Sequence, residues 1–380
     1  MGILSVNHSV DDEVFRVPRL DFELTHGCDH ACGHCYNVWG AEPDDPQGGY
    51  KKGQLRGPEF LAMVEKSLTQ SGAQHVTITG GEPLLHKNAL EIIELCCSMI
   101  PSVQVITNGS HVTEEVARRF AAAGVRAVQL TLLSANPGKH DLLKGATCFD
   151  DTVRAALTLR DHGVPTQCCF VAMRQNWRDF AEVIELCHLL GISQISYNRM
   201  SPTGGAVHHI NRLMPEVAQV SENLDTAERL GRHYGLRVAT AMPIPPCLVR
   251  MERYDWVEFG FCSTGTESPN LTVDSLGNVR SCNLSSHILG NIVEQDWPEI
   301  YARIRTYQDD FKRDVPEICQ GCRYEHSCQG GCKESAFATF GEVSHPEPFV
   351  HLATNSAWRD AVNAKPDTAA LDCPGEALGR

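Results

Sequence analysis

The chain has 380 residues, enough for two or three domains, and its net charge of −14 argues against nucleic acid as a main partner, because phosphate backbones require basic surface. Hydrophobic residues make up 42% of it, but there is no run of about 18 apolar residues and no long apolar N-terminal stretch, so we expect neither a membrane span nor a secretory signal, and a cytoplasmic location. Seventeen cysteines in such a chain favour metal ligation over disulfides.

Strands and helices alternate over the first half of the chain, which is typical of a parallel α/β fold. Strands are predicted at 20–25, 75–79, 103–107, 127–133, 165–173 and 194–198. Helices are predicted at 58–71, 88–100, 114–123, 149–162 and 176–190. Six units within about 190 residues predict a partial (β/α)6 TIM-like barrel, since a closed eight-unit barrel needs about 250 residues. In such barrels the chemistry lies at the C-terminal ends of the strands.

The rest of the chain has a different texture. A helix at 216–234 leads into a proline-rich bend, and from 255 onward short strands and Cys-rich loops follow, with a β-hairpin that turns at Gly277. The predicted domains are an N-terminal arm (1–18), a barrel core (19–212), a bridging helix and linker (213–254), a Cys-rich domain (255–375) and a tail (376–380).

Three cysteines, Cys28, Cys32 and Cys35, follow the first strand within eight residues. Thiolates this close can converge on one soft metal centre, such as an iron–sulfur cluster, zinc or Cu(I). A closed structural zinc site needs four ligands, and no fourth cysteine lies nearby. Three ligands instead leave one iron of a cubane [4Fe–4S] cluster open to an outside ligand. A zinc knuckle or unrelated buried thiols are the alternatives.

This C-x3-C-x2-C spacing after a first strand resembles the radical S-adenosylmethionine (SAM) superfamily. The resemblance implies an oxygen-sensitive oxidoreductase in which the open iron binds the amino and carboxylate groups of SAM. Reductive cleavage of SAM then gives methionine and a 5′-deoxyadenosyl radical, which abstracts hydrogen. The motif Gly80-Gly81-Glu82-Pro83 after the second strand is similar to the family's GGEP, which implies a site for the SAM amino group.

Three further segments resemble SAM-binding motifs of the same family. Asn108 lies in a TNG sequence after the third strand. Thr131 replaces the usual Ser after the fourth strand, and Ser134 is its rival for a SAM contact. Lys144 stands where an Arg often meets the SAM carboxylate, a change that keeps the charge but loses bidentate geometry. A solvated surface lysine is the alternative there.

The C-terminal cysteines resemble the SPASM extension, which carries two auxiliary [4Fe–4S] clusters; with the core, the resemblance covers about nine-tenths of the chain. It implies Cys262, Cys282 and Cys332 as ligands of the first auxiliary cluster, which either takes Cys247 as a fourth ligand or keeps one iron open. The implied ligands of the second are Cys319, Cys322, Cys328 and Cys373. The alternative is one zinc site made of Cys319, Cys322, Cys328 and Cys332.

The remaining cysteines, Cys96, Cys97, Cys148, Cys168, Cys169 and Cys187, are expected to pack in the core. Two histidines inside the first cysteine loop, His30 and His34, are expected to be solvated rather than to hydrogen-bond around a cluster.

The resemblance implies three [4Fe–4S] clusters, SAM and, as the favoured function, maturation of a ribosomally made peptide by a crosslink or an oxidised residue. The implied partners are a peptide substrate, a separate leader-peptide recognition protein and a flavodoxin- or ferredoxin-type electron donor, with no nucleic acid and no membrane. One alternative is a formylglycine-forming sulfatase-type maturase, disfavoured because Asn283 replaces its usual basic Asp. Others are a small-molecule or haem-pathway enzyme and a non-catalytic zinc-bound scaffold. No catalytic acid or base is assigned.

Overall fold

The computed structural model describes residues 17–55, 57–266, 268–357 and 360. One 11-stranded sheet runs through this part of the chain, in the order β11-β10-β9-β1-β2-β3-β4-β5-β6-β7-β8. The strands are β1 (Arg19–Glu23), β2 (His75–Thr79), β3 (Ser102–Thr107), β4 (Ala127–Thr131), β5 (Thr166–Ala172), β6 (Gln194–Arg199), β7 (Arg237–Thr240), β8 (Val257–Phe259), β9 (Asn270–Val273), β10 (Asn278–Arg280) and β11 (Ile288–Asn291).

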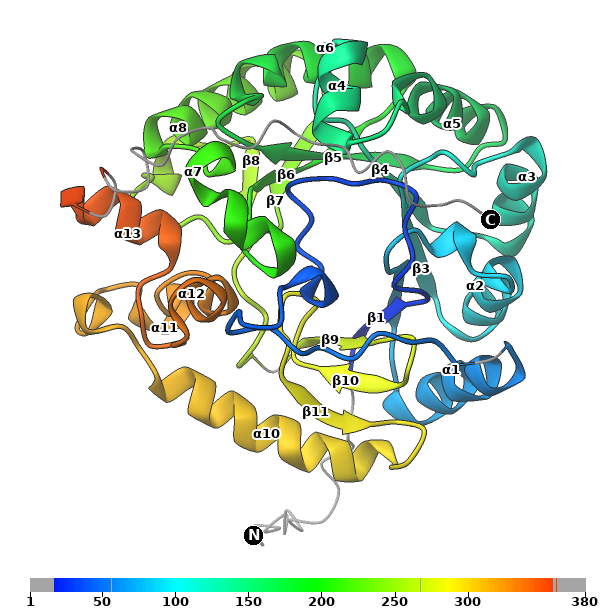
Figure 1. Cartoon of the computed structure of the whole chain (residues 1–380). Coiled ribbons are helices and arrows are strands. Elements are labelled where there is room, and N and C mark those ends of the chain that lie inside the picture. Colours follow the sequence, from blue (N-terminus) through cyan, green and yellow to red (C-terminus); the bar gives the residue numbers. More distant parts are fainter. Residues whose placement is uncertain (1–16, 56, 267, 358–359, 361–380) are drawn as a thin grey trace, which may run out of the picture.

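Helices surround this sheet on its outer side (Figure 1). The α-helices are α1 (Gly57–Ser71), α2 (Ala89–Met99), α3 (Glu114–Ala123), α4 (Pro137–Lys144), α5 (Phe149–Asp161), α6 (Phe180–Leu190), α7 (Ile210–Leu213), α8 (Val217–Thr226), α9 (Arg232–Tyr234), α10 (Trp297–Arg313), α11 (Glu325–Cys328), α12 (Lys333–Phe340) and α13 (Pro348–Thr354). No helix within the described ranges is both long and apolar enough to cross a bilayer.

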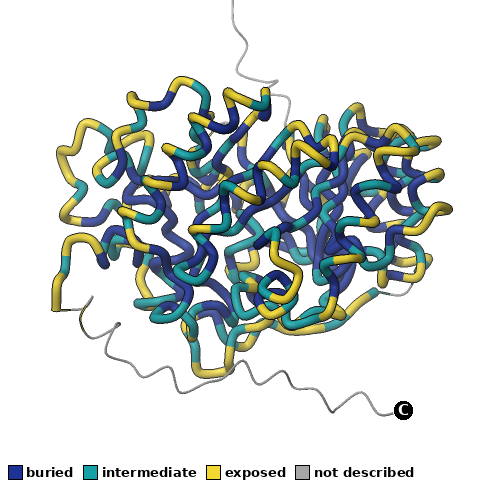
Figure 2. Tube along the Cα trace, turned by 90° about the horizontal axis from the view of Figure 1, so that it is seen from above, coloured by how far each residue is buried: buried dark blue, intermediate teal, exposed yellow. Residues whose placement is uncertain are grey.

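Strands β1 to β8 are parallel neighbours and curve into a partial barrel whose two end strands do not pair with each other. Buried residues gather in the middle of the molecule, as Figure 2 shows, and helices cover the outer face of the strands. The predicted partial barrel and its six strands are confirmed, each strand to within two residues at either end. The sheet continues through β7 and β8, which the sequence analysis placed in a linker and at its border.

The C-terminal third is built onto the barrel through its first strand. β9 pairs parallel to β1, with Arg19 opposite Asn270 and Phe22 opposite Val273. β9 and β10 form the predicted hairpin, in which Gly277 takes a left-handed φ of 83°. A single sheet therefore crosses the boundary expected at residue 255, and the division into domains remains a prediction.

Two fully buried ion pairs fasten this third to the barrel. Arg280 of β10 donates to the Glu23 carboxylate at the end of β1, and also to the Ser285 carbonyl at 2.7 Å. Arg199, at the end of β6, pairs with Glu347, which immediately precedes α13. Both pairs lie where the barrel meets the Cys-rich segments, so they fix the position of these segments.

Candidate functional site

One cavity, with a volume of about 470 Å³, lies inside the partial barrel and against the C-terminal third. Two separate groups of cysteines line it. Cys28, Cys32 and Cys35 come from the loop after β1, and Cys262, Cys282 and Cys332 come from three C-terminal loops. Five of the residues predicted to bind a cofactor also line it: Gly80, Gly81, Asn108, Thr131 and Lys144.

The first cysteine loop is held between the end of β2 and the end of α4. Gly81 donates its N–H to the Thr25 carbonyl at 2.7 Å, and a Cβ at this position would lie 2.0 Å from the Gly27 carbonyl oxygen. Gly145 ends α4 with a φ of 60°, and its Cβ would lie 2.5 Å from the Ala31 carbonyl oxygen. Only glycine allows these close approaches, so both ends of the loop depend on it.

Glu82 supports the cavity from behind and does not line it. Its carboxylate is 1% exposed and accepts hydrogen bonds from the Thr107 hydroxyl and the Asn108 N–H, both at 2.7 Å, and from the Leu84 N–H at 3.1 Å. Burial raises the pKa of Glu82, and these bonds oppose the rise. The carboxylate thus positions Asn108, while Pro83 begins a short 3-10 turn behind the wall. Contact of Glu82 with a SAM ammonium group stays a prediction.

The structure separates the two rival hydroxyls after β4. Thr131 lines the cavity, whereas Ser134 is fully buried outside its wall and accepts from the Asn136 N–H at 3.1 Å. Lys144 also lines the cavity, although only 5% of it is exposed. The alternative of a solvated surface lysine is therefore wrong.

The expectation that the two loop histidines are solvated is also wrong, since both are half-buried in the cavity wall. The His30 ring nitrogen lies 3.2 Å from the Ser110 hydroxyl. Burial, followed by the nearby charge of Lys144, lowers the pKa of His34 to about 3. His34 is therefore neutral at physiological pH, and Lys144 carries the positive charge beside the loop.

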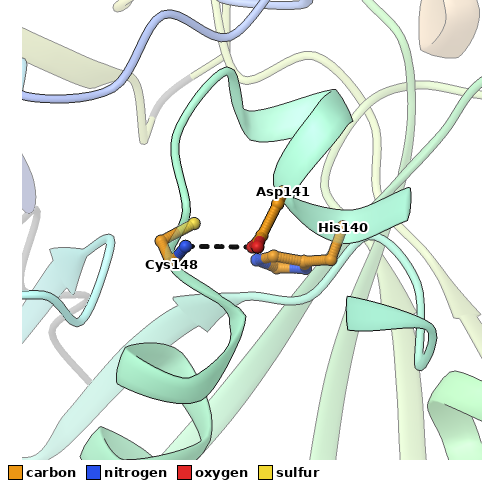
Figure 3. A group of neighbouring side chains, drawn as sticks. All are labelled: His140, Asp141 and Cys148. Atoms are coloured by element: carbon orange, nitrogen blue, oxygen red, sulfur yellow. Dashed lines mark hydrogen bonds between the residues drawn. The ribbon is translucent and has the colours of Figure 1, made fainter. Parts of the chain in front are cut away.

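Within the described residues, one group of metal-ligand side chains has its ligand atoms all within 4.8 Å of one another: His140, Asp141 and Cys148 (Figure 3). The Asp141 carboxylate accepts from the backbone N–H groups of Cys148 at 2.9 Å and Phe149 at 2.8 Å. These are the first donors of α5, so Asp141 caps this helix. His140 Nδ1 accepts from the Leu133 N–H at 3.3 Å. The group joins α4 to α5 and so supports Lys144.

The C-terminal cysteines form two groups rather than one. Burial raises the pKa of Cys282, and Glu334, Cys262 and Cys332 raise it further, so these three thiols are neighbours at the cavity wall. The other C-terminal cysteines of the described chain lie outside this wall: Cys247, Cys319, Cys322 and Cys328. Because Cys332 faces the cavity apart from that second group, the arrangement opposes a single zinc site. Cys373 lies outside the described residues.

Sequence reasoning missed the polar floor of the cavity. Asp21 of β1, Gln104 of β3 and Gln129 of β4 line it, and each is flanked along its strand by apolar residues that do not line it. This alternation was visible in the sequence, since inward and outward positions alternate along a barrel strand. Burial raises the pKa of Asp21 to about 6, against hydrogen bonds from Thr77 and Asn270. Another cavity residue, Cys169, was expected only to pack.

Two separate family models match the barrel and part of the Cys-rich segments. The radical SAM superfamily model matches residues 22–187, and the SPASM model, an iron–sulfur cluster-binding domain, matches residues 262–323. The chain contains a radical SAM domain and a SPASM domain. It is an enzyme, and these two domains imply iron–sulfur clusters and SAM as cofactors.

Three relatives each match 87% of the chain. An AdoMet-dependent heme synthase of Nitratidesulfovibrio vulgaris is 25% identical, covering 87% of this chain and 90% of its own. The mycofactocin maturase MftC of Mycolicibacterium smegmatis is 24% identical, covering 87% and 81%. The PqqA peptide cyclase of Methylocella silvestris is 24% identical, covering 87% and 86%.

Solved structures share the fold. Streptococcus suis SuiB bound to S-adenosylmethionine superimposes with a TM-score of 0.68 at 16% identity, covering 88% of this chain and 77% of SuiB. SuiB bound to its precursor peptide SuiA gives a TM-score of 0.67, and anSMEcpe bound to AdoMet and a peptide gives 0.65, each at 16% identity. These likenesses establish the architecture of barrel and C-terminal extension.

The residues present fit the cofactors that the family implies. Three thiols of one loop line the cavity, and thiolates are the ligands of iron–sulfur clusters. The glycines at the end of β2 leave backbone exposed beside this loop, and Lys144 offers a cation to a carboxylate. The donors of a cluster and the contacts of a charged nucleotide ligand therefore meet in one wall.

Proposed function

We propose that the chain is a radical SAM maturase that abstracts hydrogen from a peptide and leaves a crosslink or an oxidised residue. One observation carries the proposal: a single cavity is bounded by the Cys28–Cys35 loop and by the thiols of Cys262, Cys282 and Cys332. A substrate side chain in this space lies between two sets of cluster ligands. The names of MftC and the PqqA cyclase, and the SuiB complex with its precursor peptide, support a peptide as substrate.

In this proposal Cys28, Cys32 and Cys35 hold a [4Fe–4S] cluster, and SAM binds beside it. Cluster and SAM together supply a 5′-deoxyadenosyl radical. Gly80, Gly81 and Asn108 present backbone and amide groups to the SAM amino end, Thr131 offers a hydroxyl, and Lys144 pairs with the carboxylate. Glu82 and Pro83 act from behind the wall, with Glu82 holding Asn108 in place, and Ser134 supports the turn after β4. Two auxiliary clusters on the C-terminal cysteines bring the total to three.

The other wall residues position the substrate and handle protons. The carboxylates among the described lining residues are Asp21 and Glu334. Burial raises the pKa of both, that of Asp21 to about 6, so the Asp21 carboxylate can accept a proton close to neutral pH. Glu334 accepts from the Tyr307 hydroxyl at 3.0 Å, which fixes its orientation beside Cys282.

The heme synthase relative makes a tetrapyrrole the second candidate substrate. A tetrapyrrole carries several carboxylates and needs cations to receive them. The lining cations within the described chain are Lys144, Arg199 and Lys333. Arg199 is already paired with Glu347, and the Lys333 ammonium donates to the Phe311 carbonyl. The wall is therefore better suited to a peptide than to a polycarboxylate.

The cavity also bears on formylglycine formation. Asn283 lines the wall after Cys282 and donates to the Tyr36 hydroxyl at 3.2 Å. The position faces the substrate space, but an amide cannot take a proton as a carboxylate does. This favours a different peptide modification.

The test is anaerobic turnover. Reconstituted enzyme, SAM and dithionite are incubated either with the short peptide encoded beside the gene or with propionate-bearing haem precursors. Mass spectrometry that shows peptide minus two hydrogens, with matching 5′-deoxyadenosine, supports the proposal. Unchanged peptide beside a decarboxylated tetrapyrrole refutes it. We further propose a flavodoxin- or ferredoxin-type electron donor, since cleavage consumes an electron, and a separate leader-recognition protein. Replacement of dithionite by each donor, and pull-down with the leader, test these partners.

A further inference from the structure

Three cysteines outside the cavity wall, Cys319, Cys322 and Cys328, lie on the segment between α10 and α12. Cys319 ends a short 3-10 turn, and Cys322 donates its N–H to the Cys319 carbonyl at 3.1 Å. The Tyr324 N–H points at the Cys322 sulfur at 3.4 Å. Cys328 ends α11. One folded segment thus presents three thiols.

Cys247 lies in a turn far away in sequence, where Pro245 accepts from the N–H groups of Leu248 and Val249 at 3.0 and 3.3 Å. The following residues are tied to the loop of Cys319–Cys328. The Glu252 carboxylate accepts from the Tyr324 hydroxyl at 2.7 Å, and the Arg323 guanidinium lies 3.6 Å from it. Five residues after Cys247 the chain is therefore bonded to the residues that follow Cys322.

A second connection lies on the other side of the Cys247 turn. Arg199 donates to the Pro243 carbonyl at 3.1 Å and pairs with Glu347. The Glu347 carboxylate lies against Gly331, where a Cβ would stand 2.3 Å from its oxygen. Gly331 in turn donates its N–H to the Cys328 carbonyl at 2.9 Å. The turn is thus held beside the loop from both ends.

The electrostatic environment of the thiols agrees with this geometry. Burial raises the pKa of Cys319, and Cys247 raises it further, ahead of Cys322. Cys322 likewise raises the pKa of Cys247 after burial. The neighbours that raise the pKa of Cys282, in contrast, are Glu334, Cys262 and Cys332.

We propose that Cys247 is the fourth thiolate ligand of the centre held by Cys319, Cys322 and Cys328. Four cysteines complete a [4Fe–4S] cluster, so Cys373 is not needed there. The three cavity thiols of the first auxiliary set then have no cysteine from this turn and keep a position open toward the substrate space. The inference rests on the proposed auxiliary clusters, but not on the identity of the substrate.

The test compares full-length, anaerobically purified Cys247→Ala and Cys373→Ala with Cys97→Ala as control, a half-buried thiol of α2. Cys247→Ala is expected to lose about four irons per chain, while Cys373→Ala and the control keep the wild-type content. If Cys247→Ala has the circular dichroism of the wild type and also its full iron content, the proposal is wrong. Loss of about four irons from Cys373→Ala also overturns it.

Alkylation of the wild-type protein gives a readout that needs no variant. Cys247 and Cys322 are both exposed when no cluster shields them. In the iron-loaded enzyme, iodoacetamide should spare Cys247 together with Cys319, Cys322 and Cys328, and chelation should expose all four at one rate. Labelling of Cys247 in the loaded enzyme, with protection of Cys373, overturns the assignment. Protection without any peptide product would refute the proposed substrate and leave the ligand assignment standing.

Discussion

Replacement of Arg280 by Met removes the positive half of the buried pair that joins β10 to β1. Arg280 is 0% and Glu23 is 1% exposed, so the change leaves a carboxylate in the interior without a partner. Removing one member of a buried ion pair costs about 3–5 kcal/mol. The pKa of Glu23 is already raised to about 7, by burial and against the pull of Arg280, and it rises further in the variant. Protonation of Glu23 then limits the cost at neutral pH.

The expected cost converts into a measurable shift of the melting temperature. At about 2.1 cal/mol/K per residue, the unfolding entropy of this chain is roughly 0.8 kcal/mol/K, so Arg280→Met should lower the melting temperature by about 4–6 °C. The matched control is Arg118→Met, which breaks an ion pair with Glu115 that is 61% and 59% exposed. Exposed pairs contribute about 0–1 kcal/mol, hence a shift of about 1 °C or less.

Differential scanning calorimetry of the two variants and the wild type checks this difference. A second variant, Arg280→Met with Glu23→Leu, replaces both charges and should recover most of the loss, because no buried charge remains. If Arg280→Met melts within a degree of Arg118→Met, the burial argument is wrong. If the double variant melts lower still, the pair itself and not the stranded charge supplies the stability.

Three further predictions concern the site. Gly145→Ala should lower the iron content and the melting temperature more than Gly124→Ala does. Both glycines have a positive φ, so an alanine at either position destabilises the fold by about 1–2 kcal/mol, but only Gly145 lies against the cysteine loop. Equal effects of the two substitutions would refute the contact. Asp21→Asn should flatten the pH dependence of stability. Because the pKa of Asp21 is raised to about 6 in the folded state, the folded protein holds a proton that the unfolded chain releases, and the free energy of unfolding falls as the pH rises. In thermal melts between about pH 5 and pH 7 the wild type should lose about 1 kcal/mol more of this free energy than the variant, and parallel curves would contradict this. Cys32→Ala should reduce 5′-deoxyadenosine to background by chromatography, whereas Cys322→Ala should still form it with little peptide product; full turnover by Cys32→Ala would show that the site is misassigned.

The barrel could be predicted from sequence because its signals are local. Strands such as β2 and β3 are short alternating runs of β-branched and polar residues between helices with clear ends. Thr113, for example, accepts from the Val116 N–H and caps α3. The helix α10 was missed although Trp297, Ile300 and Ile304 follow helical spacing, because charged residues outnumber them along its length. β8 has only three residues, too few for a pattern.

The site was predictable where spacing carries the chemistry, as in the loop of Cys28, Cys32 and Cys35. The role of Glu82 behind the wall could not be predicted, because it depends on which carboxylate oxygen meets the end of β3. The neighbourhood of Cys247 likewise arises from contacts between segments more than 70 residues apart, such as that of Glu252 with Tyr324. The spacing of residues along the chain does not predict such contacts.

The parallel pairing of β9 with β1 has a consequence for any shortened form of this enzyme. If the chain ended before β9, the backbone N–H and C=O groups along one side of β1 would be left unpaired, and β1 would become an exposed edge strand. Leu20 and Phe22, both fully buried, would lie on that strand and invite strand-to-strand association between molecules. In this chain the barrel is therefore not an independent unit, because one side of its first strand is paired only when the last third of the chain is present.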